Sequence, residues 1–400
     1  MEIKNNVNLG VTKNDHYLGV ILGLLVFIRT MPCYFWSVED TIRPICAILI
    51  LLICVFNISK AKGTLWILLC LASAYIWAVV FVDHSGLITL LNFIAFAFIP
   101  ILKKKLVFET YKTFRAIVIF FMVASIVNYL FVIFGLSFGG KVIEPLNSLK
   151  HYKYNMYPFL VTIQGDPTGR FHAIFDEPGV VGTLCGLLLI AERMNLSKKG
   201  NLVLLLAGLL SLSFYFYVAL ILGLILFSSR LKHRWVVLSF FVVLFFVSYN
   251  NDYLYNTLWY RFEWDDEEKT FVGDNRNGGG LADYYESIRG TSAFFTGRGT
   301  QAAEEYSGAA SLNLIIVKHG FIFVFLIISG FVILAFREIK NKRDLLFFFV
   351  FFILTLYQRP GFYNTSSLFL YTIVIYVFGN SNNLVQNNIN VTSTPKQALC

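Results

Sequence analysis

The sequence has few charged residues and almost none of the common catalytic or metal-binding motifs. Only 14% of its 400 residues are charged, whereas a soluble domain carries about 25%. No two of its six cysteines form a CxxC pair, which argues against a zinc ribbon or a thiol redox site. The chain also lacks a Walker loop, an HExxH pair, a GxSxG elbow and a nucleic-acid-binding motif. These absences argue against ATP hydrolysis, zinc chemistry and nucleic-acid binding, and they predict no cofactor and no metal.

The chain instead consists largely of long apolar runs. Hydrophobic residues make up 57% of the sequence, and there are 41 Phe and 21 Tyr. A membrane-spanning helix needs about 20 mostly apolar residues. The pattern predicts an all-α polytopic membrane protein with about 11–12 transmembrane segments and two long outer loops. The apolar runs lie near 17–36, 43–58, 64–82, 86–102, 114–136, 171–192, 201–227, 234–249, 311–336, 344–358 and 362–378.

The charges in the connections predict an orientation. Short basic connections face the cytoplasm, and here they are 59–64, 103–115, 192–200, 228–234 and 337–343. The segment 250–310 holds eleven acidic and five basic residues, a net charge of −6 in a chain whose net charge is +9. We therefore expect 250–310 outside the membrane and both termini in the cytoplasm.

One apolar run does not fit a single crossing. Both flanks of 201–227 are basic, so both of its ends should be cytoplasmic. One straight helix of this length would measure about 40 Å, against an apolar core of about 30 Å. We expect two short, partly inserted helices that turn near Ser211 to Phe216. Irregular backbone at membrane depth requires protein or a water-filled cavity beside it, so this turn predicts a cavity on the outer side.

These patterns divide the chain into six parts. We expect five helices in 1–136, a first outer loop in 137–170 and central segments in 171–249. A second outer loop in 250–310 and three helices in 311–380 follow. The polar stretch 381–400 reads as a disordered cytoplasmic tail.

The stretch 169–183, GRFHAIFDEPGVVGT, places charged residues at the mouth of an apolar run. On a helix, Arg170 and Glu177 would share a face because they are seven positions apart. A carboxylate in the membrane costs about 2.5–3.5 kcal/mol on insertion scales, and such acids are commonly functional. Glu177 therefore either faces a polar cavity as a functional acid or forms a salt bridge that holds helices together. His172 is a candidate base or hydrogen-bond donor.

The second outer loop contains candidate contacts for an anion and a sugar. Glycines flank Arg289 and Arg298, in SIRGTSAFFTGRGT, and they let the backbone approach a ligand closely. Arginine suits phosphate because its charge is permanent and its contacts are bidentate. Tyr284, Tyr285 and Trp259 could stack on sugar rings. The alternative for both arginines is a solvated surface charge.

Four other charged residues lie in or near the apolar runs. Arg359, in YQRPGFYNTSS, is a third candidate anion contact or an interface anchor. Arg29 we interpret as structural, because a long side chain can reach the interface. Lys318 and His319 lie inside the run 311–336. A lone intramembrane histidine is often a packing residue, and no acid lies at a matching spacing from His319.

Three stretches together resemble the bacterial O-antigen polymerases of the Wzy type, within the superfamily that includes O-antigen ligases. The first is GRFHAIFDEPGVVGTLCGLLL. The second is FFTGRGTQAAEEYSGAASLNLIIVKHGFIFVFLI, at the end of the larger of two unequal outer loops. The third is YQRPGFYNTSSLFLYTIVIY. The similarity in layout covers nearly the whole chain.

This resemblance implies a glycosyltransferase of the bacterial inner membrane with its active site on the periplasmic face. Such enzymes transfer a growing glycan from undecaprenyl pyrophosphate to a sugar hydroxyl of an incoming lipid-linked repeat unit. Loop arginines stabilise the leaving pyrophosphate, and the matching positions are Arg170, Arg289 and Arg298, with Arg359 a weaker match. Glu177 or His172 would take the proton. The resemblance also implies membrane lipids, a chain-length regulator and a flippase as partners.

Three alternatives stay open. Ligases place a histidine at the start of the span after the second loop, where this chain reads AASLN and His319 comes about two turns later, which favours a polymerase. A flippase would have small outer loops and charges along a central cavity. A membrane acyltransferase would have an intramembrane histidine or a His–Asp pair.

Overall fold

The structure is a computed structural model. It describes residues 12–30, 39–84, 86–136, 139–144, 152–165, 169–227, 239, 242, 246, 249–252, 255, 259–260, 263–265, 270–271, 280–300, 305–306, 311–358, 361 and 364–380. The expected span 234–249 falls largely outside these residues. The expected tail 381–400 and Arg359 lie wholly outside them.

The described part of the chain is mostly helical. Three helical segments are long and apolar enough to cross a membrane: Thr64–Val82, Lys104–Ile133 and Leu312–Glu338. These and the shorter apolar helices fit an all-α membrane protein, while the number of 11–12 spans stays a prediction. The helices are α1 (Lys13–Thr30), α2 (Glu39–Val55), α3 (Thr64–Ile76), its π-helical continuation η2 (Trp77–Val82), α4 (Leu87–Ala97), η3 (Ile99–Ile101), α5 (Lys104–Ile133), α6 (Pro178–Ala191), α7 (Lys199–Leu210), α8 (Phe214–Leu226), α11 (Leu281–Ile288), α12 (Ser292–Thr296), α14 (Leu312–Glu338), α15 (Lys342–Gln358) and α16 (Thr365–Gly379).

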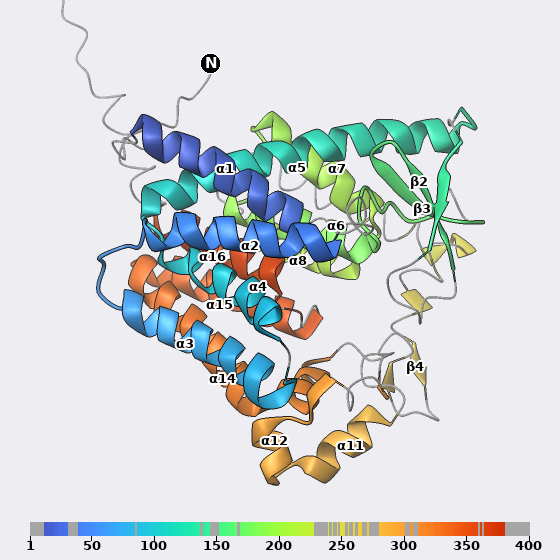
Figure 1. Cartoon of the computed structure of the whole chain (residues 1–400). Helices are drawn as coiled ribbons and strands as arrows, with labels where there is room; N and C mark the ends of the chain where they lie inside the picture. The colour runs from blue at the N-terminus through green and yellow to red at the C-terminus, as the bar shows by residue number, and fades with distance from the viewer. Residues whose placement is uncertain are drawn as a thin grey trace, which may run out of the picture.

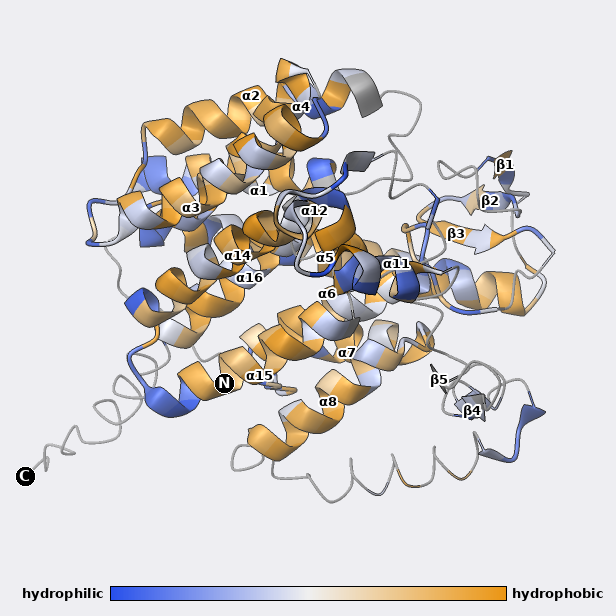
Figure 2. Ribbon diagram, turned by 90° about the horizontal axis from the view of Figure 1, so that it is seen from below, coloured by the Kyte–Doolittle hydropathy of each residue, from blue (hydrophilic) through white to orange (hydrophobic). Residues whose placement is uncertain are grey.

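The core of the bundle forms around α16. This helix contacts α1, α4, α5, α6, α14 and α15, and most of its described side chains, from Leu368 to Tyr376 without a gap, are buried. Around it, α1 packs along α5, α3 along α14, and α6 against α7 and α8 (Figure 1). The helices are hydrophobic on their outer faces as well (Figure 2), and large apolar side chains such as Phe56 and Leu87 are exposed there. An apolar outer surface is what a lipid environment requires.

Helix α5 begins much earlier than the sequence predicts. The basic stretch 103–115, which we expected to be a connection, forms the first turns of α5 from Lys104 onward. Leu106, Val107, Thr110 and Phe114 of this stretch are buried, and their spacing of three to four places them on one helical face. That mostly apolar stripe outweighs the charges of the stretch, and the one buried acid, Glu109, is paired with Lys112 and His16.

The run 201–227 is divided into two helices. Helix α7 ends at Leu210 and α8 begins at Phe214, so the break falls inside the stretch where the sequence predicts a turn. Leu212, within the break, has a left-handed φ of 47°. Because α7 and α8 have only 12 and 13 residues, neither reaches the length of about 20 residues that a full crossing needs.

Both segments that we expect to be outer loops contain regular structure that the sequence did not predict. In the first, β1 (Lys141–Ile143), β2 (Tyr154–Tyr157) and β3 (Leu160–Ile163) form an antiparallel sheet. In the second, β4 (Trp264–Asp265) pairs with β5 (Thr270–Phe271), and α11 and α12 follow. The strands have two to four residues each, too short for an alternating pattern to stand out.

Charged residues in the α6–α7 connection bind several elements together. Glu192 accepts a hydrogen bond from the Tyr111 hydroxyl of α5 at 2.6 Å and one from Lys198, and Arg115 lies 3.6 Å away. Next to it, Arg193 forms an ion pair of 2.5 Å with Asp344 of α15. This network joins α5, α6, α7 and α15 at the end where the basic connections lie.

Candidate functional site

The segment before α6 is not helical, contrary to the expectation. Residues 169–177 form turns and extended backbone, and α6 begins at Pro178. Proline suits the first turn of a helix because the missing N–H has no intrahelical partner there. Glu177 precedes it with an extended backbone, φ −136° and ψ 134°. The interpretation that Arg170 and Glu177 share a helical face is therefore wrong.

The Arg170 guanidinium contacts the end of another helix. Its Nε and Nη2 atoms donate to the carbonyls of Ser211 and Leu212, each at 3.2 Å. The last carbonyls of a helix lack intrahelical partners and carry partial negative charge. Arg170 thus stabilises the break between α7 and α8. Gly182 of α6 packs on the same break, where a Cβ would meet Ser213 Cβ at 2.2 Å.

The other residues of this segment are held by the small sheet. His172 is 3% exposed, and its ring faces Tyr154 of β2 at 6.3 Å. The Tyr154 hydroxyl donates to the Asp176 carbonyl at 3.0 Å. Asp176 and Glu177 are half-buried. We call Arg170, His172, Asp176 and Glu177 the Arg170 cluster.

A second cluster forms where the glycine-arginine-glycine turn meets α14. Gly297 and Gly299 have left-handed φ values of 82° and 83°. The Arg298 N–H donates to the carbonyl of Val317 at 2.8 Å, while the Arg298 side chain is exposed. Helix α14 is kinked at Gly320, where φ is 84° and ψ 159°. The turn packs so tightly on this kink that a Cβ on Gly297 would lie 2.6 Å from Gly320 N.

The structure places an acid beside His319 that the sequence reading missed. Asp83 follows η2, and its Oδ2 lies 3.8 Å from His319 Nδ1. Its Oδ1 accepts hydrogen bonds from Thr300 N at 2.9 Å and Thr300 Oγ1 at 2.8 Å. The side chains of His319 and Asp83 are 6% and 13% exposed. We call Asp83, Arg298, Lys318 and His319 the Arg298 cluster.

Only one signal in the sequence pointed to Asp83. It stands directly after an apolar run, in VDHSG, a connection that is not basic. An acid at the outer end of a span is a candidate by that position alone. Nothing in the spacing could pair it with His319, because the two residues meet only through the packing of α14 against α3 and η2.

The remaining residues predicted for the site lie near the Arg298 cluster or outside the described residues. Arg289 follows α11, is exposed, and pairs with Glu286 at 3.3 Å. Tyr285 is half-buried, with its ring 6.0 Å from that of Phe294. Arg359 lies outside the described residues.

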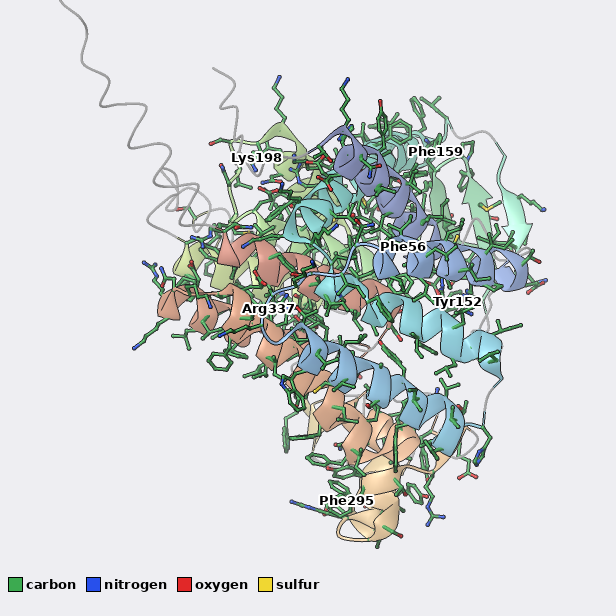
Figure 3. All side chains as sticks on the ribbon, turned by 60° about the vertical axis from the view of Figure 1, so that its left-hand side comes forward. Phe56, Tyr152, Phe159, Lys198, Phe295 and Arg337 are labelled. Carbon is green, nitrogen blue, oxygen red and sulfur yellow. The ribbon has the colours of Figure 1, made fainter. Side chains whose placement is uncertain are left out.

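The two clusters lie apart. Strands β2 and β3, which hold the Arg170 cluster, are at the upper right of Figure 1, whereas α11 and α12 are at the bottom. Figure 3 shows the same separation between Phe159, next to β3, and Phe295 on α12. The structure thus brings Arg289 and Arg298 into one region and places Arg170 in another. Within the residues described, no group of three or more His, Cys, Asp or Glu side chains could hold a metal ion.

No protein-family model, curated protein or solved structure matches this chain.

Proposed function

We propose that this protein is a membrane glycosyltransferase that polymerises lipid-linked glycan repeat units at the outer face of the bacterial inner membrane. The donor is a growing glycan on a polyprenyl pyrophosphate such as undecaprenyl pyrophosphate. The acceptor is a sugar hydroxyl of an incoming lipid-linked unit. The acceptor oxygen bonds to the anomeric carbon, the bond from that carbon to the pyrophosphate oxygen breaks, and the lipid pyrophosphate leaves with the electron pair.

The observation that carries the proposal is the backbone-anchored turn of Arg298. The main chain on both sides of this arginine is held by hydrogen bonds and its side chain is exposed, while the half-buried Lys318 directly follows Val317, whose carbonyl binds the Arg298 N–H. Two cations carried on an anchored backbone would stabilise a leaving pyrophosphate as negative charge develops on it. Arginine adds bidentate hydrogen bonds to phosphate oxygens.

His319 is the candidate proton acceptor of this cluster. It lies next to Lys318 in the chain, and its Nδ1 is 3.8 Å from Asp83 Oδ2, too long for a hydrogen bond but close enough for the carboxylate to attract a proton on the imidazole. The histidine is buried, so an acceptor sugar would have to displace part of the turn to reach it. Glu177 and His172 of the Arg170 cluster are the alternative proton acceptors.

The chain's charge pattern supports the outer location. The connection between α6 and α7 and the one between α14 and α15 are basic, as cytoplasmic connections are. The Arg298 cluster lies at the start of α14, the end opposite to its basic connection. A lipid-linked substrate would meet the cluster there with its headgroup at the membrane surface.

A lipid-linked oligosaccharide flippase is the second candidate, and the broken pair α7–α8 is the observation that favours it. Interrupted helices with exposed backbone groups form substrate sites in many transporters. Here Arg170 binds the carbonyls at the break, so a flippase would have to free them during transport.

Reconstitution separates the two candidates. The purified protein is placed in liposomes with the undecaprenyl-pyrophosphate repeat unit of its source strain, without ATP, nucleotide sugar or metal. We expect a ladder of lipid-linked products on a gel. Protection of the repeat unit from an external probe, with no ladder, would establish translocation and reject the polymerase.

A further inference from the structure

We propose that Asp83 is a positioning residue that holds Arg298 at the pyrophosphate subsite, through its hydrogen bonds to Thr300. The inference rests on the proposed function for its ligand, a polyprenyl pyrophosphate. It gives a role to a residue outside both outer loops.

The hydrogen bonds show how Asp83 reaches Arg298. Asp83 Oδ1 accepts from both the backbone N–H and the hydroxyl of Thr300, at 2.9 and 2.8 Å. Thr300 is two residues after Arg298, and the Arg298 N–H is itself bound to the Val317 carbonyl at 2.8 Å. The main chain of Arg298 is thus fixed on one side by α14 and on the other by Asp83. Hydrogen bonds to an ionised carboxylate are about twice as strong as neutral ones.

The helical segment that precedes Asp83 is itself held in place by its neighbours. Asp83 directly follows η2, which continues α3 and packs against α14 and α4. From η2, the Trp77 indole N–H donates to the His319 carbonyl at 3.2 Å. The turn approaches this segment closely, because a Cβ on Gly299 would lie 3.3 Å from the Val82 carbonyl oxygen. A loop residue 217 positions away in the chain is therefore attached to the end of the third apolar run.

The same carboxylate can serve two functions that substitutions can separate. Asp83→Asn keeps an oxygen that accepts both Thr300 hydrogen bonds but loses the negative charge facing His319. Asp83→Ala loses both. A positioning role predicts that binding of the pyrophosphate survives the first change and not the second, whereas turnover suffers in both if His319 takes the proton.

The test measures binding of undecaprenyl pyrophosphate to the full-length protein in nanodiscs. We expect Asp83→Ala to weaken binding about 10-fold and Thr300→Val, which keeps the backbone N–H bond to Asp83, to weaken it by a smaller but measurable factor, with Asp83→Asn and Thr300→Ser close to wild type. Thr296→Val is the matched control, because the bonds of its hydroxyl within the described part of the chain go to backbone carbonyls, that of Ser292 at 3.0 Å and that of Gly297 at 3.5 Å. Thr300→Val is the milder variant, and it still reports if Asp83→Ala does not fold.

A double-mutant cycle decides whether Asp83 acts through Arg298. If it does, Asp83→Ala causes no further loss of binding in an Arg298→Ala background, since coupled residues are non-additive. Additive losses, or Thr300→Val with wild-type affinity, would overturn the inference. The liposome assay reports on the proposed function separately. If the wild-type protein binds the pyrophosphate and shows this coupling but makes no ladder, the polymerase is rejected and the positioning role of Asp83 remains. If the wild-type protein does not bind the pyrophosphate, the inference is overturned.

Discussion

Arg170 and Arg298 are both arginines next to a membrane helix, and both were predicted as anion contacts. In the structure, a different part of each arginine makes the structural hydrogen bonds. The Arg170 guanidinium donates to the carbonyls of Ser211 and Leu212 at the end of α7. At Arg298 the backbone makes the structural hydrogen bond, and the side chain is exposed. Arg298 has a glycine of left-handed φ on each side, whereas Arg170 has a single neighbouring glycine without it. The two glycines let the main chain anchor the turn, so that the Arg298 guanidinium is not needed for it.

The largest expected effect comes from replacing the residue that takes the proton, and it shows which of the two clusters contains that residue. General base catalysis contributes about 10²–10⁴-fold, so His319→Gln should lower the rate of ladder formation by that factor. Glu177→Gln should stay within a few-fold of wild type. Undecaprenyl-pyrophosphate binding should be unchanged in both variants. The reverse pattern, with loss only in Glu177→Gln, would assign the reaction to the Arg170 cluster.

Substitution of Arg298 should have the next largest effect. Removal of one donor that stabilises developing negative charge costs about 10²–10³-fold in rate, and we expect Arg298→Ala to lose this much kcat/KM. Arg298→Lys should keep part of it, because the charge remains but bidentate bonding does not. The exposed Arg289, paired with Glu286, provides the comparison. If Arg289→Ala loses more than Arg298→Ala, the leaving group sits closer to α11.

Arg170→Ala should lower stability rather than chemistry. Two hydrogen bonds from a charged group to carbonyls are lost, and each such bond contributes about 1.5–3 kcal/mol. We expect a lower Tm in detergent, with the ladder rate per folded molecule within a few-fold of wild type. An unchanged Tm with a lost ladder would restore Arg170 as a pyrophosphate contact and weaken the comparison.

The smallest effect concerns a carboxylate at the opposite end of the molecule. Burial raises the pKa of Glu192, but Lys198, Tyr111 and Arg115 outweigh it and hold the pKa below its usual 4.5. Because the folded state lowers this pKa, the contribution to stability is present above pH 4.5 and is lost as the pH falls through the folded pKa. Glu192→Gln should therefore lower Tm at pH 7, and the gap from wild type should close below pH 4.5. A gap that is independent of pH would mean that packing, not charge, is responsible.

Much of the helical layout could be predicted from the sequence, because apolar runs report it directly. The run 64–82 coincides with α3 and η2 together, and the break in 201–227 lies where length and flanking charge require it. The first turns of α5 were missed because lysines and arginines masked an apolar stripe. The sheet β1–β3 was missed because its strands are too short to show a period.

The sequence could predict a feature of the candidate site only where that feature depends on residues that are neighbours in the chain. Glycines around Arg298 point to a tight turn in any context, and the turn is there. The Asp83–His319 pair depends on how α14 packs against η2, and no spacing in one sequence encodes that contact. The contact of Arg170 with the α7–α8 break has the same origin. Tertiary packing decided which arginine became structural.

The close packing of Gly297 on the kink at Gly320 restricts which substitutions these two positions can accept in evolution. Each glycine has a left-handed φ and leaves no room for a Cβ on the other, so a substitution at either position cannot be compensated by a change at its partner. Two such positions cannot covary, however many descendants of this gene are compared. This contact would therefore leave no trace in correlated substitutions between homologues. A scan of single substitutions would reveal it as two positions that tolerate only glycine.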